Sequence, residues 1–569
     1  MPHDLLPTVP PLPDGQAAIS HEGLLSRNYA DLGDRYMRTW AGEDVPLDVV
    51  VAEADAELVL TTDMPAPGQP ADGRWRTLNF TRSGRHDHRL CLRPEHPGAY
   101  QFRVKYRLPG DPKWYWDRAG FTRLLVDPTW QRNLRVYTLV PTVSGHVGDW
   151  IEMLPAIAAM GFNVIHLLPL SHMDYSASPY CALELCALDP HYLDPTDPRD
   201  GVEQFSDFAD RAVDLGLRLC MDLVLNHVGP ASGIARHAPD WIQADPAEPD
   251  GFRRAGWSDG THWHKWRDLC LLQFDHPDPE RRQALWDYMI GYARFWSSFA
   301  HRTGGMVRLD NLHSGHEGLV GAVLSALRED FPDLGILAEL FTDPANMGRL
   351  VWEYRLGLLL ATPWEHRFLP QLRSYLEFIH HQSPQVHFHF PISSHDSGSP
   401  AEEFGHPDST KPRYAVAALC SCGYTGMVQG VEYGVAHKLE FIGRHGRLEL
   451  AGDRDYSTFI SRINSLMDRF PHFQVGGNLR FVDHGHEAVL AAVRSPAAGD
   501  SRYVLILANF DIGRGHRLQL RRHDLAPDAG ELRLRDLLTT AAPPSGGEII
   551  DITLQPCEVR VYSLEPELP

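Results

Sequence analysis

The stretch Gly305-Met-Val-Arg-Leu-Asp-Asn-Leu-His313 decides the fold, together with Ile336-Leu-Ala-Glu339 and Ser394-His-Asp396. In each case a short apolar run gives way to a carboxylate. An apolar run of this length is typical of a buried strand. Because an uncompensated buried charge is costly, three strands that end in acids predict that these acids converge at one mouth of a parallel barrel.

Size and composition narrow the class of protein. With 569 residues the chain exceeds the roughly 250–300 residues that one hydrophobic core serves, so we expect several domains. The net charge of −21 argues against nucleic acid or an anionic membrane as a partner and is compatible with a neutral substrate such as a sugar. The chain has 8 cysteines without a C-x-x-C pair, which favours free thiols over a zinc site or a disulfide framework.

The expected location follows from the same cysteine usage and from two further patterns. The first residues, Met1-Pro-His-Asp-Leu-Leu-Pro7, have neither the basic nor the apolar region of a secretory signal. No apolar stretch approaches the ~18 residues of a membrane span. Together these patterns predict a cytoplasmic protein of unknown oligomeric state.

The periodicity of apolar residues divides the chain into four predicted regions. Residues 1–40 have the composition of a loose extension, and 41–130 show the short alternating runs of a β-sandwich. Between 131 and 475, strand-like runs alternate with amphipathic helical segments, which predicts a (β/α)8 TIM barrel of the α/β class with an inserted loop domain at 228–278. A doubly wound open sheet is the alternative. Residues 476–569 again have β patterning and predict a C-terminal β-sandwich.

Two groups of aromatic residues allow more than one interpretation. Trp114, Tyr115 and Trp116 lie in the predicted N-terminal sandwich, which is either a structural module or a glycan-binding one. The inserted segment carries four tryptophans that serve either as stacking platforms for a sugar or as packing residues: Trp241, Trp257, Trp263 and Trp266.

The acids at the strand ends are suited to glycosidic chemistry. Arg308 lies two residues before Asp310, so both side chains share one face of the strand, and the guanidinium is expected to keep Asp310 ionised as a nucleophile. Glu339 follows an apolar run, and burial is expected to raise its pKa so that it acts as an acid. Asp396 follows His395 and suits a third, non-covalent role. Two carboxyl groups in opposite protonation states can cleave a glycosidic bond with retention.

One strand earlier, Asp222-Leu-Val-Leu-Asn226-His227 also ends in polar residues. A lone Arg-x-Asp pair is more often a salt bridge, and a lone Asn-His after a strand is usually a loop cap. Four strand ends in chain order, each with acids or imidazoles, make a coincidence improbable.

The motifs Asp222-x-x-x-Asn226-His227, Arg308-x-Asp310, Glu339 and His395-Asp396 resemble the four ordered motifs of the α-amylase family, glycoside hydrolase family 13. The resemblance spans roughly 131–475. It implies a (β/α)8 barrel with a loop domain after the third strand and a C-terminal β domain.

The resemblance also implies roles for individual residues. Asp310 would be the nucleophile, Glu339 the general acid and base, and Asp396 the stabiliser of the transition state. The ring of Tyr180 in Ser178-Pro-Tyr180 would stack on the sugar bound beside the nucleophile. The candidate substrate-binding residues are Tyr180, Asp222, His227, Arg308, His313 and His395.

Finer features indicate the subfamily. Asp310-Asn-Leu-His313 followed by Ala338-Glu-Leu-Phe-Thr342 is similar to the glucanotransferase domain of glycogen debranching enzymes and to maltose-1-phosphate-dependent maltosyltransferases. The sequence departs from the latter at His316, where those enzymes have a lysine, which lowers the expectation of a phosphorylated donor. It departs from the family at Ser394, where an asparagine usually precedes His-Asp.

The resulting hypothesis is a retaining 4-α-glucanotransferase that acts on maltooligosaccharides or a glycogen-type α-glucan. The alternatives are an α-glucan hydrolase of the amylase or α-glucosidase type, a maltose-1-phosphate-dependent maltosyltransferase, and a non-catalytic glucan-binding protein. We expect no cofactor and no metal. Calcium bound through Asn226 lacks support, because no cluster of acids lies beside that residue in the sequence.

Overall fold

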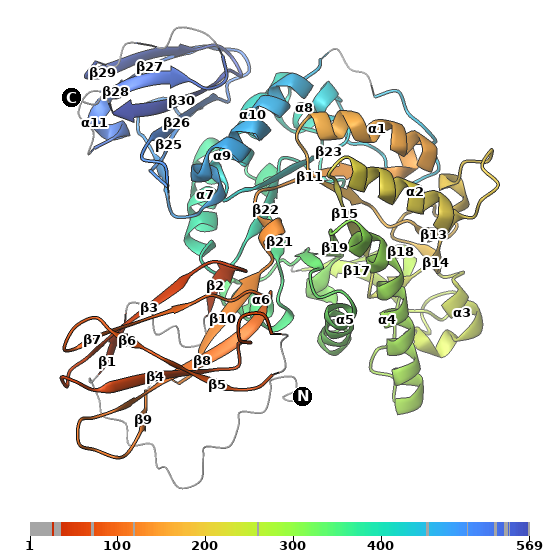
Figure 1. The fold of residues 1–569 in the computed structure, drawn as a ribbon. Coiled ribbons are helices and arrows are strands. Elements are labelled where there is room, and N and C mark those ends of the chain that lie inside the picture. Colours follow the sequence, from red (N-terminus) through yellow and green to blue (C-terminus); the bar gives the residue numbers. More distant parts are fainter. Residues whose placement is uncertain are drawn as a thin grey trace. The chain divides into compact units, whose positions relative to one another are not determined.

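The computed structural model describes residues 25–27, 36–69, 73–117, 120–258, 261–450, 454–497, 499–527, 532–539, 544 and 547–566 (Figure 1). These residues form two compact units. One includes the N-terminal β domain up to Gln131 together with Phe341–Gly357, and the other includes Arg132–Leu340 and Leu358 onward. Most of the predicted extension at 1–40 lies outside the described residues.

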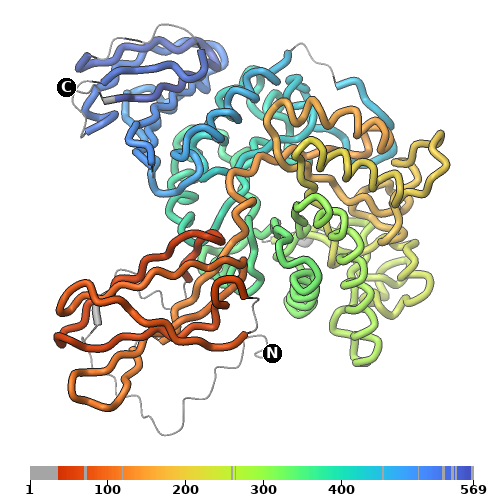
Figure 2. The backbone as a smooth tube through the Cα atoms, viewed as in Figure 1, coloured from red at the N-terminus to blue at the C-terminus, as the bar shows by residue number. Residues whose placement is uncertain are grey.

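A closed barrel of eight parallel strands forms the centre of the second unit, and helices lie around it (Figure 2). Nearly all residues of these strands are buried, as expected when both faces of a parallel sheet are covered. The predicted (β/α)8 barrel is confirmed, and the open doubly wound sheet is wrong. The barrel strands are β11 (Leu134–Leu139), β12 (Val164–Leu167), β15 (Arg218–Leu223), β19 (Met306–Leu309), β20 (Gly335–Ala338), β21 (Leu358–Leu360), β22 (Phe388–Pro391) and β23 (Tyr424–Val428).

Two strands differ from the sequence-based expectation. β21 has only three residues and was not predicted. β22 ends at Pro391, so Asp396 does not end a strand as expected but lies in the loop that follows.

The helices of the barrel region begin at residues suited to cap a helix. α2 starts with a capping box, in which the Asp200 side chain accepts the Glu203 backbone N–H and the Glu203 side chain accepts the Asp200 backbone N–H. The Asp278 side chain caps the N-terminus of α4, whose first residue is Pro279. The helices are α1 (Val147–Ala159), α2 (Gly201–Asp214), α3 (Gly233–His237), α4 (Pro279–Arg302), α5 (Glu317–Asp330), α6 (Pro344–Tyr354), α7 (Leu369–Gln382), α8 (Pro400–Phe404), α9 (Thr410–Cys420) and α10 (Ser457–Arg469). No helix among the described segments combines the length and hydropathy that a membrane crossing requires.

Two short sheets extend the loops that follow barrel strands. β13 (Ser171–Met173) and β14 (Ala182–Leu188) form a hairpin after β12. After β15, the inserted segment folds into an antiparallel sheet in the order β16-β18-β17. Its strands are β16 (His227–Val228), β17 (Arg254–Ser258) and β18 (Trp263–Leu271). These two sheets position Tyr180 and His227, respectively.

The N-terminal unit contains two sheets around one apolar core. One sheet comprises β1 (Leu25–Arg27), β3 (Val45–Val51), β7 (Asp87–Leu92) and β6 (Thr81–Arg82). The other comprises β2 (Met37–Trp40), β10 (Thr122–Asp127), β8 (Gly98–Arg107), β4 (Glu57–Thr62) and β5 (Arg76–Asn79), with β9 (Tyr115–Trp116) beside β8. α6 belongs to this unit although it follows a barrel strand in the chain.

Two tryptophans of the N-terminal unit, Trp114 and Trp116, each lie close to two cations of β8. The Trp114 ring centre lies 5.0 Å from the Arg107 guanidinium and 5.3 Å from Lys105 Nζ. The Trp116 ring centre lies 5.6 Å from Lys105 Nζ and 5.1 Å from the Arg103 guanidinium. The cations lie over ring faces on which a sugar would stack, which favours a structural role for these rings.

The C-terminal residues form a second β domain around its own apolar core. A five-stranded sheet has the order β24 (Leu479–Phe481), β25 (Val489–Arg494), β26 (Tyr503–Asn509), β30 (Val559–Pro566) and β28 (Leu532–Asp536). β27 (His516–Arg521) pairs with β29 (Ile549–Leu554), and α11 (Arg522–Leu525) follows β27. The structure therefore has a TIM barrel with β-rich domains before and after it, as predicted.

Candidate active site at the carboxyl ends of the barrel strands

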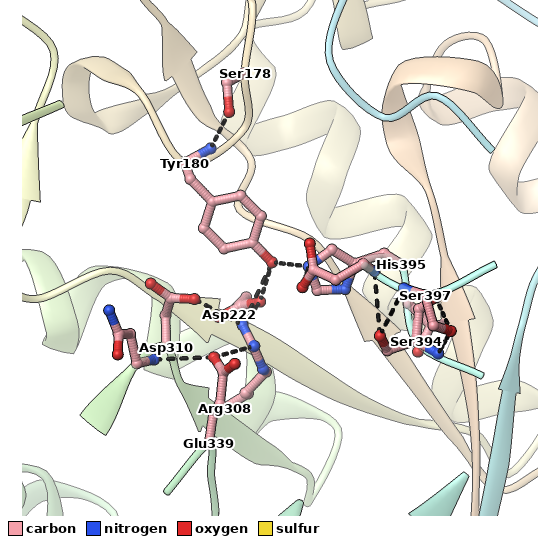
Figure 3. A network of polar contacts seen from close by, with 12 residues as sticks. Ser178, Tyr180, Asp222, Arg308, Asp310, Glu339, Ser394, His395 and Ser397 are labelled. Carbon is pink, nitrogen blue, oxygen red and sulfur yellow. Dashed lines mark hydrogen bonds and ion pairs between the residues drawn. The ribbon is translucent and has the colours of Figure 1, made fainter. Parts of the chain in front are cut away.

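Arg308 lies at the centre of the acid cluster (Figure 3). Its Nη1 lies 2.6 Å from Asp222 Oδ2 and 3.1 Å from Asp310 Oδ1, and its Nη2 lies 2.6 Å from Glu339 Oε2. The Arg308 side chain is only 4% exposed. One buried guanidinium therefore contacts carboxylates from three neighbouring strands, β15, β19 and β20, as the chain order of the motifs predicts.

The electrostatics of this cluster differ from the expectation for Asp310. Burial raises the pKa of the Asp310 carboxyl well above its usual range, and Arg308 opposes this effect while Glu339 and Asp222 add to it. The pKa of Asp222 is lowered: burial acts upward, but Arg308 and a hydrogen bond from His166 outweigh it. The shift of the Asp310 pKa is therefore opposite to the one expected from its pairing with Arg308 alone.

Glu339 has a polar setting rather than the expected apolar one. Besides Arg308 Nη2, its Oε2 accepts a hydrogen bond of 3.0 Å from the Asn311 backbone N–H. The Glu339 backbone carbonyl accepts another, of 2.9 Å, from the Leu312 N–H. The turn after Asp310 thus holds Glu339 next to the nucleophile candidate. The expected purely apolar setting of Glu339 is therefore wrong, and its role as general acid and base stays a prediction.

Tyr180 connects the cluster to the loop after β22. Its hydroxyl donates to Asp222 Oδ2 at 3.0 Å and lies 2.8 Å from His395 Nε2. The rings of Tyr180 and His395 are stacked, with centroids 5.5 Å apart. His395 Nε2 also lies 3.0 Å from Asp396 Oδ2. A hydrogen-bonded path therefore joins Asp396 to Asp222 and so to Arg308.

Asp396 is the most accessible of the four acids, with its side chain 59% exposed. Its backbone carbonyl accepts a 3.0 Å hydrogen bond from Lys438 Nζ. Burial alone would raise the pKa of the Asp396 carboxyl. His395, Arg308 and Lys438 together outweigh this effect, so the pKa lies below its usual range. Asp396 is thus an ionised and accessible carboxylate, and its role as stabiliser of the transition state stays a prediction.

The remaining candidates lie at the edge of this cluster. His227 is buried, its ring centroid is 6.4 Å from that of Trp266, and burial lowers the pKa of its imidazole to about 4. His313 is exposed on the turn after Asp310. Asn226 is buried in the short segment between β15 and β16. Within the described ranges, no group of three or more His, Cys, Asp or Glu side chains is arranged to hold a metal. The roles of His227 and His313 stay predictions.

Sequence reasoning missed three contributors to the site. His166 Nε2 contacts Asp222, Lys438 contacts Asp396, and the Asn311 N–H contacts Glu339. His166 had a detectable signal, because it is a lone imidazole inside the apolar run of β12. Ser394 was noticed only as a departure from the family. Its Oγ accepts hydrogen bonds from the Asp396 and Ser397 N–H groups and so shapes the turn that presents Asp396.

Tyr180→Phe should lower kcat/KM for the glycosidic reaction by about tenfold, the expected loss for one charge-assisted hydrogen bond. The aromatic ring is kept, but Asp222 and His395 lose the hydroxyl between them. Steady-state kinetics would measure the change. An unchanged kcat/KM would show that the hydroxyl does not organise the site.

Comparisons with known proteins found one matching family and several similar proteins. The family described as glycogen debranching enzyme, glucanotransferase domain, matches residues 129–245. An α-1,4-glucan:maltose-1-phosphate maltosyltransferase from Salinibacter ruber is 26% identical over 452 residues, which are 73% of this chain and 65% of that protein. The enzyme of the same name from Mycolicibacterium smegmatis is 24% identical over 64% of this chain and 54% of its own length. The chain thus spans less than two thirds of the length of these relatives.

Solved structures share the fold. The α-amylase from Geobacillus thermoleovorans, complexed with acarbose, has a TM-score of 0.61 at 16% identity and covers 77% of this chain and 100% of its own. A cyclomaltodextrinase has a TM-score of 0.61 at 14% identity over 95% of this chain and 99% of its own. Together, the comparisons confirm the resemblance to the α-amylase family and its barrel fold. The proteins similar to this chain are enzymes, in agreement with the sequence-based prediction.

Proposed function

We propose that this chain is a retaining 4-α-glucanotransferase that moves α-1,4-linked glucosyl or maltooligosyl units through a covalent glycosyl-enzyme on Asp310. The observation that carries the proposal is the Arg308 guanidinium, which bridges Asp310 and Glu339. It holds both carboxyl groups close to one another at the carboxyl ends of adjacent strands. A nucleophile and an acid in such proximity are what a double displacement requires.

In the proposed first step, Glu339 is the general acid. When a glucan occupies the site, Glu339 gives a proton to the leaving glycosidic oxygen while ionised Asp310 attacks the anomeric carbon. The C–O bond to the leaving chain breaks and an ester to Asp310 forms. Asp396 and Arg308 face the sugar as charge develops on it. In the second step, Glu339 takes the proton of an acceptor hydroxyl, which displaces Asp310 and restores the α-linkage.

The proteins that this chain resembles favour transfer over hydrolysis. The matching family is a glucanotransferase domain, and the similar maltosyltransferases are transferases by name. The α-amylase and cyclomaltodextrinase structures, at 16% and 14% identity, support only the fold. The proposed substrates are maltooligosaccharides or a glycogen-type glucan in the cytoplasm. The proposed reaction needs no cofactor, because side chains provide each group that it uses.

A second candidate is maltosyl transfer from maltose-1-phosphate. The names of the similar curated proteins favour it, and the same two carboxyl groups would perform it. Phosphate is a good leaving group, so this donor would depend less on protonation by Glu339 than a glucan does.

A product ladder from pure maltopentaose should separate these functions. We expect products both longer and shorter than the substrate, because a maltooligosyl unit passes from one chain to another. Chromatography with pulsed amperometric detection resolves each chain length. Asp310→Ala should give no products and serves as the control.

Any other outcome would assign a different function to this chain. Only shorter products would identify a hydrolase and contradict the transferase proposal. No change with maltopentaose, but growth of maltohexaose when maltose-1-phosphate is added, would establish the second candidate. No turnover of either donor would favour a non-catalytic glucan-binding protein.

A further inference from the structure

A line of polar contacts continues from the acid cluster into the interior of the barrel. His166 on β12 lies with Nε2 3.2 Å from Asp222 Oδ2 and with Nδ1 3.2 Å from Thr138 Oγ1 on β11. The strands bring these residues together, because Thr138 and His166 are register partners across β11 and β12. His166 is 5% and Thr138 8% exposed, so bulk water does not compete for these bonds.

The partners of His166 determine its tautomer. Asp222 is ionised and can only accept, so His166 must donate from Nε2. Burial lowers the pKa of the His166 imidazole, an effect that Arg308 and His395 reinforce and Asp222 opposes. The neutral ring therefore has a bare Nδ1, which accepts the hydroxyl proton of Thr138.

His166 Nε2 is one of three donors around the same oxygen of the Asp222 carboxylate. Asp222 Oδ2 receives His166 Nε2, the Tyr180 hydroxyl and Arg308 Nη1 at 3.2, 3.0 and 2.6 Å. In the described part of the chain, Asp222 Oδ1 is buried without a hydrogen-bond partner. The orientation of the carboxylate thus depends on three donors that converge on Oδ2. Tyr180 and Arg308 both belong to the cluster that faces the sugar, whereas His166 lies on the neighbouring strand and is anchored by Thr138.

We propose that His166 is a positioning residue for the glycosidic reaction. It fixes the Asp222 carboxylate and, through it, the Arg308 guanidinium that bridges Asp310 and Glu339. The kinetic consequence rests on the proposed function, whereas the hydrogen-bonded arrangement does not. A misplacement of about 1 Å at a reacting group can cost about 10²-fold in rate. Loss of the His166 donor acts on both reacting carboxyl groups at once, because both contact Arg308.

The barrel contains a matched control for the structural role of a buried histidine. His389 on β22 is also 5% exposed, and burial lowers the pKa of its imidazole to about 3. Its Nδ1 has no hydrogen-bond partner within the described residues. A loss of packing should therefore affect both histidines alike. A loss of positioning should affect only His166, which faces Asp222, Arg308, His395 and His389.

The test compares His166→Leu, His166→Gln and His389→Leu by fluoride release from α-maltosyl fluoride, a donor that reports the first step whatever the acceptor. We expect His166→Leu to lower kcat by about 10²-fold with KM little changed. His389→Leu should keep nearly full kcat. His166→Gln should recover most of the loss, because its amide can donate to Asp222 and accept from Thr138. The pH dependence of kcat should change in His166→Leu alone, since Asp222 and Arg308 set the charge around the Asp310–Glu339 pair.

Two results would overturn the proposal. One is an equal loss of kcat and melting temperature in His166→Leu and His389→Leu, without recovery in His166→Gln. The other comes from ¹⁵N NMR of histidine-labelled wild type, in which the signal missing from His166→Leu should be a neutral Nε2–H tautomer from about pH 6 to 8. An Nδ1–H tautomer would remove the donor to Asp222. If the wild type released no fluoride, the glucan function would fail, and the NMR result would still decide the arrangement.

Discussion

Asp310→Asn should abolish turnover and at the same time make the folded protein more stable at neutral pH. The amide cannot form the glycosyl-enzyme, so kcat should fall by about 10⁴-fold or more. The stability gain has a different origin. Burial and the neighbouring carboxylates Glu339 and Asp222 disfavour the charge on Asp310, which raises the pKa of that carboxyl. An uncharged side chain of the same shape avoids this repulsion and can still accept from Arg308 Nη1, 3.1 Å away.

The pH dependence of this gain has a defined sign. Because the pKa of Asp310 is higher in the folded than in the unfolded state, the folded wild type binds the proton more tightly. Its stability therefore falls as pH rises above the unfolded value of about 3.9. Differential scanning calorimetry should show a stability gain of about 1–2 kcal/mol for Asp310→Asn near pH 7 that shrinks towards pH 4.

Asp222→Asn is the matched control, and it should lower the stability of the folded protein instead of raising it. Arg308 and His166 lower the pKa of Asp222 despite its burial, so its charge stabilises the fold above the unfolded pKa and the effect is lost as pH falls. The same substitution there removes a buried charge partner of Arg308, which typically costs about 3–5 kcal/mol. A lower melting temperature for Asp310→Asn than for the wild type at pH 7 would contradict the proposed distribution of charge.

The barrel was predictable because its strands are apolar runs that end in acids. Two of these strands, Met306–Leu309 and Gly335–Ala338, are buried throughout. Each is followed directly by an acid, Asp310 or Glu339. β21 was not predictable, because three leucines between a helix and a turn resemble any core segment. Nor does the sequence reveal that Pro344–Tyr354 belongs to the N-terminal unit, since the pattern of a helix does not identify the surface on which it packs.

The site was predictable in its residue types but not in its charges. Each acid could be assigned separately from its neighbours in the chain, which suggested that Arg308 serves Asp310 and that apolar burial protonates Glu339. In the structure one guanidinium serves Asp222, Asp310 and Glu339 together. Such sharing depends on the register between strands, and the chain order alone does not specify it. His166 was missed for the same reason, because its partner Asp222 is 56 residues away.

Glu339→Gln should separate the two steps of the proposed reaction. With maltopentaose, kcat should fall by about 10²–10⁴-fold, because the glycosidic oxygen leaves without a proton. With α-maltosyl fluoride the first step should largely survive, since fluoride needs no proton to leave. The glycosyl-enzyme on Asp310 should then accumulate, because no base remains to activate an acceptor hydroxyl. Mass spectrometry of the intact protein would detect the added maltosyl group.

Added azide should restore turnover of α-maltosyl fluoride by Glu339→Gln, because this anion attacks without a general base. The product should be the α-azide, since two displacements at the anomeric carbon restore the starting configuration. A β-azide would mean that azide displaces fluoride directly, and this would contradict a covalent intermediate on Asp310. The Gln amide can still accept from Arg308 through its oxygen, so the bridge to Asp310 should persist and the nucleophile should stay in place. Loss of fluoride release in this variant would therefore indicate that Glu339 also organises Arg308, and that its charge contributes to the first step.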